Sequence, residues 1–445
     1  MERDGGNLLK VMTRACLCLC FTFAGVFHAQ EMPDWINPFL YTVVLTGLTA
    51  CTPALHSAFY VPDQQEASLK NNARPFEPGK LADPCAAQEN YLPDSIDLRL
   101  YPTRRLRVNV HFMNSSDSAH NYPEEEAYRF VEGLLISANK DLRENNPSWL
   151  PHRNQIPVFP VGYEMVLSAQ PGDRGIYFHY DDALCYYIHK GKDNNLMDRR
   201  MAERYGIGRD SILNLFILPH FPDSLRSPTY PKGPVGVMVH DFIKMAGFFE
   251  SKQPPWAYRG VLNHEVGHVF GLNHAWQADG CPDTPEHNQP CWNRTETPPC
   301  DTAASNNVMD YNALQNAWTP CQIARIRQRM ANEHHLSRKF LVPNGCALNE
   351  AQSIVVAGNA HWKTAADLEG SVVVKSGAEL RISCRISLPA NGKILVEPGG
   401  VLILDASSRL HNACGMRWQG IEMQRQGRRQ GEVRVTGAPV LENLN

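Results

Sequence analysis

Apolar and polar residues alternate over residues 105–112 (RLRVNVHF), which is the pattern of a half-buried β-strand. Residues 124–142 show a different period, because Phe130, Leu134 and Ala138 recur at helical spacing after three glutamates that suit the positive end of a helix dipole. Further strands are predicted at residues 163–169, 212–219 and 233–242, the last as a sheet edge near a cleft. These elements predict a folded α/β (α+β) domain.

A second helix is predicted after the strand at residues 233–242. Pro254 and Pro255 favour a helix that begins at about Trp256. Gly271 is its natural end, since glycine adopts the left-handed conformation of a helix terminus at the lowest cost. The chain is therefore expected to turn at Gly271.

Residues 346–445 show a third pattern, in which short alternating strands recur at a fixed period. Residues 374–382 (VKSGAELRI) match residues 396–404 (VEPGGVLIL) at an offset of 22, and residues 416–423 fit a further coil. This period predicts coils of a parallel β-helix, an all-β region, with hairpins of a small sandwich as the alternative. Two clear copies are fewer than such stacks generally need, so the region is expected to be truncated or open to a partner.

The first 51 residues are expected to direct export. Lys10 and Arg14 precede an apolar run at residues 15–27, an order typical of a secretory signal. A second run ends in LTAC at Cys51, which resembles a bacterial lipoprotein signal with an acylated cysteine; one extended signal is the alternative. Residues 52–95 are polar and rich in proline and asparagine, like a pro-segment or linker. A secreted or cell-surface protein of a bacterium is expected.

The composition changes this picture little. A chain of 445 residues that is 43% hydrophobic and 20% charged is typical of a globular protein with two or three domains. The formal net charge of −3 provides no excess of positive charge. Nucleic acid and anionic membrane surfaces are therefore not expected as partners.

The second predicted helix carries the strongest candidate chemistry, in HEVGHVFGLNH. His264 and His268 lie one turn apart on the same face, so both imidazoles can bind one zinc ion. The turn at Gly271 brings His274 round as a third ligand. Three protein ligands leave a fourth position open, as in catalytic zinc sites. Glu265, beside the first ligand, is expected to act there as a general base toward water.

An ordinary helix rich in histidine is the alternative, but HExxHxxGxxH arises by chance in on the order of one such chain in ten thousand. The motif resembles that of the metzincin metalloproteases, which also need a methionine turn downstream. Residues 305–312 (SNNVMDYN) look like that turn. The resemblance implies that Met309 forms the floor beneath the metal and that Tyr311 stabilises the tetrahedral intermediate.

Within the metzincins, the chain most resembles the pappalysin (cytophagalysin-like) family. The resemblance rests on HEVGHVFGLNHAW, GCPDTP, spaced cysteines, NNVMDY and WTPCQIARIRQRM, where Thr319 and Gln322 form a capping-box pattern that begins a helix. It covers roughly residues 100–340. It implies a zinc peptidase domain at residues 96–342, with a mixed five-stranded sheet and an active-site helix.

Four of the thirteen cysteines, Cys281, Cys291, Cys300 and Cys321, lie close together in the sequence. In an oxidising compartment they predict two disulfides, with a structural zinc site as the alternative, and spacing alone leaves three pairings open. The family resemblance implies the pairs Cys281–Cys300 and Cys291–Cys321. The late position of Cys321 departs from the family pattern and weakens the second pair.

The resemblance suggests two further sites. The family often binds calcium, for which Asp283 and Thr284 are the candidates here; a plain turn is the alternative. Some members are kept inactive by a pro-segment cysteine that ligates the zinc, and Cys85 lies where such a switch is expected. A disulfide between Cys85 and Cys185, or a free thiol, is the alternative.

These features together predict an exported zinc endopeptidase that acts on a protein or peptide substrate. The three histidines hold zinc, Glu265 moves the proton and Tyr311 donates to the developing oxyanion. No carboxylate lies between Asp310 and Glu333, so nothing there predicts a pocket for basic side chains. The alternative is a surface-binding or adhesion protein whose β-region binds a cell-surface glycan or protein, with the peptidase domain as scaffold.

Overall fold

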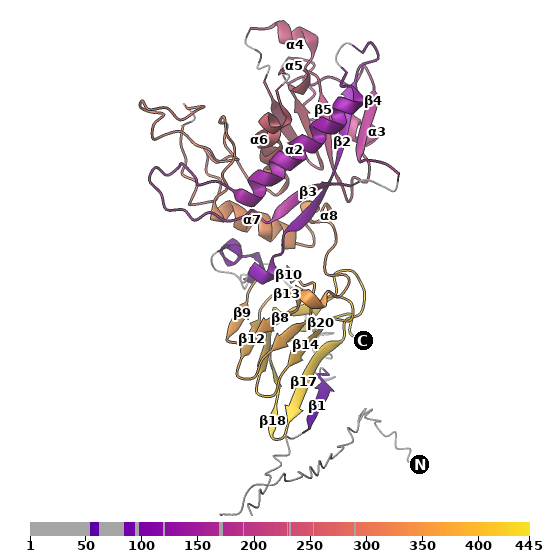
Figure 1. Ribbon diagram of the computed structural model, residues 1–445, viewed down its shortest axis with the longest axis vertical. Coiled ribbons are helices and arrows are strands. Elements are labelled where there is room, and N and C mark those ends of the chain that lie inside the picture. The colour runs from indigo at the N-terminus through magenta and orange to yellow at the C-terminus, as the bar shows by residue number, and fades with distance from the viewer. Residues whose placement is uncertain are drawn as a thin grey trace, which may run out of the picture. The chain divides into compact units, whose positions relative to one another are not determined.

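The structure is a computed structural model, drawn in Figure 1. It describes residues 54–61, 84–93, 98–118, 121–168, 172–189, 191–228, 230, 233–251, 253–288 and 291–445. The predicted export region at residues 1–51, with Cys51, lies outside the described residues. Within the described residues, every helix is too short or too polar to span a bilayer.

A mixed sheet forms the centre of the first folded region (Figure 1). Its strands are β2 (Arg104–Asn114), β3 (Tyr163–Leu167), β4 (Ile176–Tyr180), β5 (Leu213–Leu218), β6 (Val235–Val239) and β7 (Phe242–Ala246). They follow the order β3-β2-β5-β7-β6, with β4 also paired to β2, and only the β6–β7 pair is antiparallel within this sheet.

This sheet differs from the prediction in two respects. It contains six strands and not five, because the long strand β2 pairs with β3 along its first half and with β4 along its second half. The strand predicted at residues 233–242 ends at Val239, and the chain turns there and returns as β7. The antiparallel hairpin leaves β6 at the sheet edge, as the sequence predicted.

Helices cover both faces of the sheet. Because side chains alternate along each strand, neighbouring residues of one strand pack against helices on opposite faces. Leu213, Leu215 and Leu106 face a core shared with α2 (Glu124–Glu144), α6 (Arg259–Val269) and α7 (Pro320–Ala331). Phe216 and Met113 point the other way, toward α3 (Arg200–Tyr205). The short helices α4 (Pro222–Arg226), α5 (Phe248–Ser251) and α8 (Leu336–Lys339) complete the region.

The helix starts and ends follow the sequence closely. Helix α2 buries Phe130, Leu134 and Ala138, as their spacing predicted. Helix α7 begins with the predicted capping box, in which the Thr319 side chain accepts from the Gln322 backbone and the Gln322 side chain accepts from Thr319. A four-residue 3-10 helix, Pro255–Tyr258, leads into α6.

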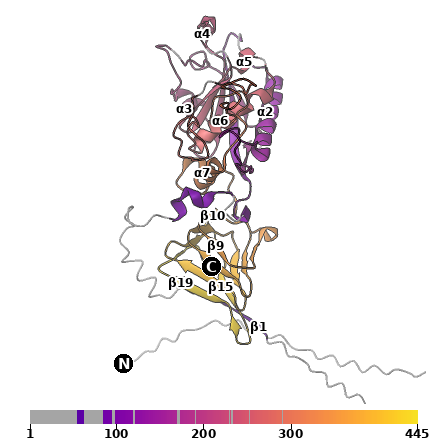
Figure 2. The same cartoon turned by 90° about the vertical axis from the view of Figure 1, so that its left-hand side faces the viewer.

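The second folded region is all-β and consists of three sheets whose strands pair in parallel, except for the antiparallel pair of β17 with β18 and that of β17 with β1 (Leu55–Phe59). Its strands are β8 (Ile354–Val356), β9 (Ala360–Trp362), β10 (Ala366–Asp367), β11 (Val372–Val374), β12 (Glu379–Ile382), β13 (Arg385–Ser387), β14 (Lys393–Val396), β15 (Val401–Asp405), β16 (Arg409–His411), β17 (Gly420–Gln426), β18 (Arg429–Gln430), β19 (Glu432–Thr436) and β20 (Val440–Leu441). The sheet orders are β17-β14-β11-β8, β19-β15-β12-β9 and β10-β13-β16-β20. Figure 2 shows β15 beside β19.

The register of these strands confirms the 22-residue repeat. Leu380 pairs with Leu402, and Ile382 pairs with Leu404. Four strands pair in parallel along each sheet, which is more than the two clear sequence copies indicated. This pairing is the pattern predicted for coils of a parallel β-helix, and it places the aliphatic side chains in one continuous core.

The described parts of residues 52–95 are folded, which the prediction of a pro-segment or linker did not anticipate. Strand β1 (Leu55–Phe59) pairs antiparallel with β17 of the all-β region. The 3-10 helix Gln88–Tyr91 packs against α7, and Gln88 donates to the backbone oxygen of Cys321 at 3.2 Å. These two pieces are therefore integral to the fold.

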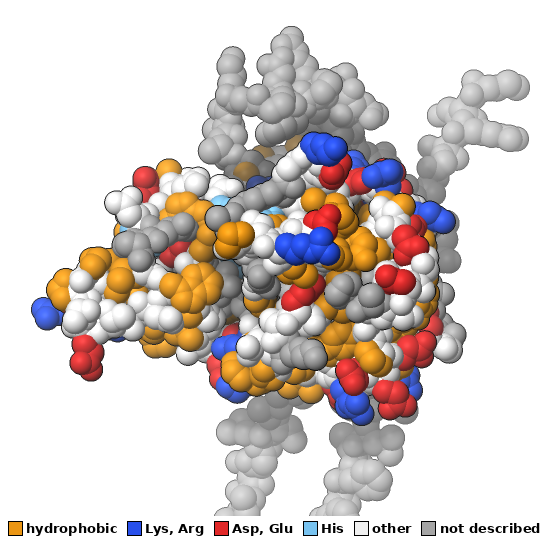
Figure 3. Space-filling view, turned by 90° about the horizontal axis from the view of Figure 1, so that it is seen from above, with side chains coloured by type: hydrophobic (Ala, Val, Ile, Leu, Met, Phe, Trp, Pro, Cys, Tyr) orange, Lys and Arg blue, Asp and Glu red, His pale blue; other side chains and the backbone are white. Residues whose placement is uncertain are grey.

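The surface carries charges of both signs. In the face seen in Figure 3, basic and acidic side chains are interspersed among apolar ones. Large exposed apolar side chains occur in several elements, for example Ile136 on α2 and Trp256 before α6. The mixed charges agree with the small net charge of the sequence.

Candidate active site

The end of helix α6 sets the positions of the three histidines. The helix ends at Val269, and Gly271 has a φ of +77°, in the left-handed region that favours glycine. The backbone N–H of Leu272 then donates to the carbonyl of Gly267 at 3.0 Å, which closes the helix end. The reversal brings His274 back toward His268, as the sequence predicted.

The Nε2 atoms of the three histidines converge on one point. The Nε2 of His268 lies 3.2 Å from the Nε2 of His264 and 3.2 Å from the Nε2 of His274. The Nδ1 of His264 lies 2.7 Å from the carbonyl of Val308, and the Nδ1 of His268 lies 2.8 Å from that of Leu272. A carbonyl only accepts, so Nδ1 carries the proton in both rings and each Nε2 presents a lone pair.

This arrangement of donor atoms fits a cation. Lone pairs at such short separations repel one another unless a positive charge lies between them. Nitrogen ligands of a tetrahedral zinc at ~2.05 Å are ~3.3 Å apart, close to the observed spacing. Burial lowers the pKa of His264 to about 3, that of His274 to about 4 and that of His268 below its ordinary value, so all three rings are neutral at pH 7.

Glu265 lies beside this cluster in an unusual environment. The residue is 5% exposed, and burial raises the pKa of its carboxyl to about 8, while a hydrogen bond from the backbone of Met238 on β6 acts in the opposite direction. Gly236 of the same strand faces the carboxylate so closely that a Cβ at this position would lie 2.5 Å from the Cγ of Glu265. Strand β6 therefore forms one wall around the carboxylate.

The methionine predicted beneath the site lies under α6. Met309 is fully buried, and its sulfur would collide with a Cβ built on Gly267, so only glycine at that helix position lets the methionine approach. The carbonyl of Met309 accepts from the backbone N–H of Ala275 at 2.9 Å. These contacts connect the methionine turn to both sides of the histidine cluster.

Tyr311 stands at the open side of the cluster. It is 51% exposed, and its ring centre lies 5.6 Å from that of His264 and 5.3 Å from that of His274. Burial of part of the ring and the neighbouring Glu265 raise the pKa of the phenol, so it keeps its proton at neutral pH. The phenol is thus available as a hydrogen-bond donor.

Three residues of the site were given no role in the sequence prediction. Trp276 stacks on His274 with ring centres 4.1 Å apart and approaches Tyr311 to 4.6 Å, so it supports both. Tyr187 lies close enough to Glu265 for their charges to interact, and this interaction, together with the larger effect of burial, raises the pKa of Tyr187. Gly236 makes room for Glu265. The tryptophan lies two residues after His274, whereas nothing in the sequence marks the other two.

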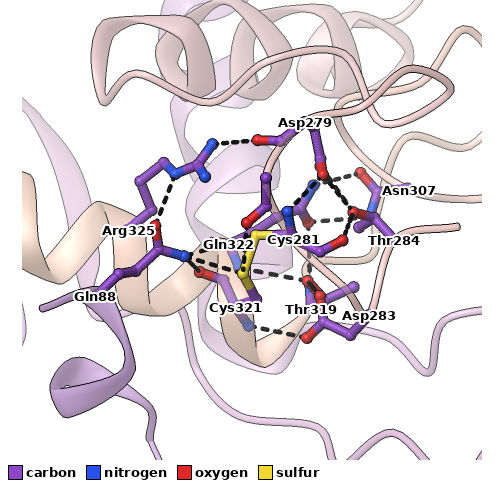
Figure 4. Close-up of a disulfide and its surroundings, with 11 residues drawn as sticks. Gln88, Asp279, Cys281, Asp283, Thr284, Asn307, Thr319, Cys321, Gln322 and Arg325 are labelled. Carbon is purple, nitrogen blue, oxygen red and sulfur yellow. Dashed lines mark hydrogen bonds between the residues drawn. A yellow bond between two sulfur atoms is a disulfide. The ribbon is translucent and has the colours of Figure 1, made fainter. Parts of the chain in front are cut away.

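The four clustered cysteines form disulfides, but the pairing implied by the family resemblance is wrong. Cys281 is bonded to Cys321, and Cys291 to Cys300. Figure 4 shows the surroundings of the first bond: Asp283 accepts from the Cys321 backbone at 2.9 Å at the start of α7, and this contact holds the loop of Cys281 against that helix end.

The candidate calcium residues have protein partners. The carboxylate of Asp283 accepts from Thr319 Oγ1 at 2.7 Å as well as from Cys321, and Thr284 Oγ1 donates to Asp279 at 2.8 Å (Figure 4). Asp283 thereby satisfies a backbone N–H at the start of α7, in keeping with the plain-turn alternative. Calcium at these residues stays a prediction.

The candidate cysteine switch does not fit the structure. Cys85 forms a disulfide with Cys384 of the all-β region, with their Cα atoms 5.5 Å apart. A disulfide sulfur has no thiolate to offer a metal, so Cys85 in this state cannot block the histidine cluster. The alternative pair with Cys185 is also wrong, since Cys185 is a buried free thiol.

Comparison with known families assigns the segment that holds this site. Residues 248–331 match the family model described as pregnancy-associated plasma protein-A. This segment belongs to the pappalysin family. It contains the three histidines, Glu265, Met309 and Tyr311, and pappalysins are metzincin-type metalloproteases. The site is therefore that of a metalloprotease.

Solved structures show a more distant likeness. Mature mirolysin of Tannerella forsythia, solved with a cleaved peptide, is 18% identical, and the match covers 54% of this chain and 95% of that chain with a TM-score of 0.36. A promirolysin mutant of the same organism is 17% identical and covers 62% of this chain and 90% of its own, also with a TM-score of 0.36. No curated protein sequence matches the chain.

Proposed function

We propose that the chain is an exported, zinc-dependent endopeptidase. The observation that carries the proposal is the convergence of the Nε2 atoms of three neutral imidazoles, with the buried carboxylate of Glu265 on the residue next to the first of them. Three nitrogens with a carboxylate at the open side suit a catalytic zinc, whereas a structural zinc has four protein ligands. His264, His268 and His274 would hold the ion.

A zinc ion bound there supplies Lewis acidity to the scissile carbonyl and to water. Glu265 accepts the proton of the attacking water on its carboxylate and returns it to the nitrogen of the leaving amine. Tyr311 donates its phenolic hydrogen to the oxygen of the former carbonyl.

Strand β6 supports the proposal that the substrate is an extended peptide. It pairs with β7 on one side and stands at the end of the sheet order, so its other side can pair with a peptide strand. Because Met238 and Gly236 of this strand contact Glu265, a peptide added along β6 would run past the base. An edge strand forms hydrogen bonds with the N–H and C=O groups of a peptide main chain. It therefore favours substrates with peptide bonds over substrates with other amides.

Export is supported by the cysteines. The described residues contain four disulfides, Cys85–Cys384, Cys281–Cys321, Cys291–Cys300 and Cys346–Cys414. Such bonds form and persist in oxidising compartments outside the cytosol. We therefore place the active enzyme outside the cytoplasm.

The test is cleavage of a proteome-derived peptide library by the zinc-loaded protein, with Glu265→Gln as the variant. We expect turnover to fall by at least 10³-fold while the zinc content, measured by mass spectrometry of metals, stays at one ion per chain. Glu132→Gln on α2 is the control and keeps full activity. Turnover by Glu265→Gln comparable to that of the control would refute the proposal.

A further inference from the structure

A small cavity lies away from the active site, beside the start of β2 and against α7 and β10. Its volume is about 20 Å³, which is room for one water-sized group. Apolar side chains form part of the wall, and the guanidinium groups of Arg104 and Arg327 form another part, with Tyr101 and Asp367 beside them.

Two arginines present unpaired donors at this cavity. The Nε of Arg104 and the Nε and Nη1 of Arg327 are buried and have no hydrogen-bond partner among the described residues. Arg327 is 5% exposed, so solvent does not satisfy these atoms. Buried polar groups are almost always paired, and charged donors are the costliest to leave unpaired.

The carboxylate at the cavity is already shared among three arginines. Asp367 accepts from Arg104 at 3.0 Å, from Arg338 at 2.8 Å and from Arg385 at 2.7 Å. Arg327 adds a fourth guanidinium group, and none of these groups loses its proton near neutral pH.

A second carboxylate, that of Glu333, also approaches this cluster. Glu333 approaches Arg385 only to 4.0 Å and pairs with Arg409 at 2.6 Å. Three guanidinium groups therefore share one carboxylate, whereas Arg327 lies over the Tyr101 ring and forms no ion pair among the described residues. The result is an excess of positive charge beside the cavity.

We propose that this cavity binds one small monovalent anion, chloride in the physiological setting, on the free N–H groups of Arg104 and Arg327. An anion accepts from all three nitrogens and offsets the charge excess. A water molecule fits by size but has two lone pairs for three donors and brings no charge.

The position of the ion implies an effect on stability. Arg104 begins β2 and Arg327 lies on α7, while Ala365 and Ala366 of the all-β region form part of the cavity wall. An anion held by both arginines would link β2 to α7 at the point where the two folded regions meet. A ligand that binds only the folded state raises the unfolding temperature by mass action.

The first experiment compares thermal unfolding of the full chain in sodium chloride and in sodium gluconate, at 100 mM and equal ionic strength. We expect a Tm about 2 °C higher in chloride. Arg327→Met should abolish this difference. Arg325→Met is the matched control, because Arg325 lies on the same helix but contacts Gln88 and Asp279 outside the cavity, and it should keep the difference.

The second experiment locates the ion and does not depend on the folding of a variant. A crystal of the wild-type chain grown in sodium bromide should show an anomalous peak within hydrogen-bond distance of Arg104 and Arg327. The absence of that peak, with a water molecule in its place, would overturn the proposal. An unchanged chloride effect in a folded Arg327→Met protein would overturn it as well.

Discussion

Gly236 allows a direct test of how closely the catalytic carboxylate is held. A Cβ at this position would lie 2.5 Å from Cγ, 2.8 Å from Oε1 and 2.9 Å from Cδ of Glu265. Ordinary contact begins at 3.4 Å, so Gly236→Ala requires a shift of about 0.9 Å, the difference between 3.4 Å and 2.5 Å. Glu265 is 5% exposed and has little room to move aside.

Misplacing a reacting group by about 1 Å costs on the order of 10²-fold in rate. We therefore expect Gly236→Ala to lower kcat/KM by about 10²-fold with the zinc content unchanged. Overpacking should also lower the free energy of unfolding by about 1–3 kcal/mol. The assay is cleavage of a fluorogenic peptide, with urea unfolding of the same samples.

Two controls separate this collision from other effects. A Cβ at Gly233, three residues earlier and exposed, meets no atom within 4 Å, so Gly233→Ala should match the wild type. In a Glu265→Ala background the carboxylate is gone, and Gly236→Ala should then cost less than about 0.5 kcal/mol of stability. Activity of Gly236→Ala within twofold of the wild type would refute the reasoning.

Four further predictions concern other parts of the molecule. Because the folded-state pKa of Glu265 is about 8 and its ordinary value is 4.5, this carboxyl binds more protons in the folded state between these pH values. The buried histidines have lowered pKa values and act in the opposite direction up to about pH 6.5, so the quantity to follow is the difference between two proteins: in urea unfolding of the metal-free chain, the stability of the wild type relative to Glu265→Gln should fall from pH 5 to pH 8. Asp367→Asn leaves three buried arginines with a neutral amide and should cost about 3–5 kcal/mol in the same assay. Trp276→Leu removes the ring stacked on His274 and should lower kcat/KM about tenfold, with zinc affinity measured by competition with a chelator. Non-reducing peptide mapping should yield Cys281 linked to Cys321; a peptide linking Cys281 to Cys300 would contradict the structure.

The sequence by itself determined what depends on neighbours along the chain. The spacing of His264 and His268 and the glycine stop at Gly271 predicted the helix and its end, because a helical turn and a left-handed residue are local properties. The Thr319 capping box is likewise local. The 22-residue repeat predicted the pairing of Leu380 with Leu402, since successive repeats of equal length place equivalent residues side by side.

Tertiary structure decided what depends on segments far apart in the sequence. The pairings of Cys85 with Cys384 and of Cys281 with Cys321 follow from which surfaces meet, and spacing does not encode that. The wall around Glu265 likewise comes from strand β6, 29 residues earlier at Gly236, so its effect on the carboxylate appears only in the folded chain. The local sequence therefore determines which residues can act as ligands of the site. Long-range packing determines the burial of Glu265, which raises the pKa of its carboxyl.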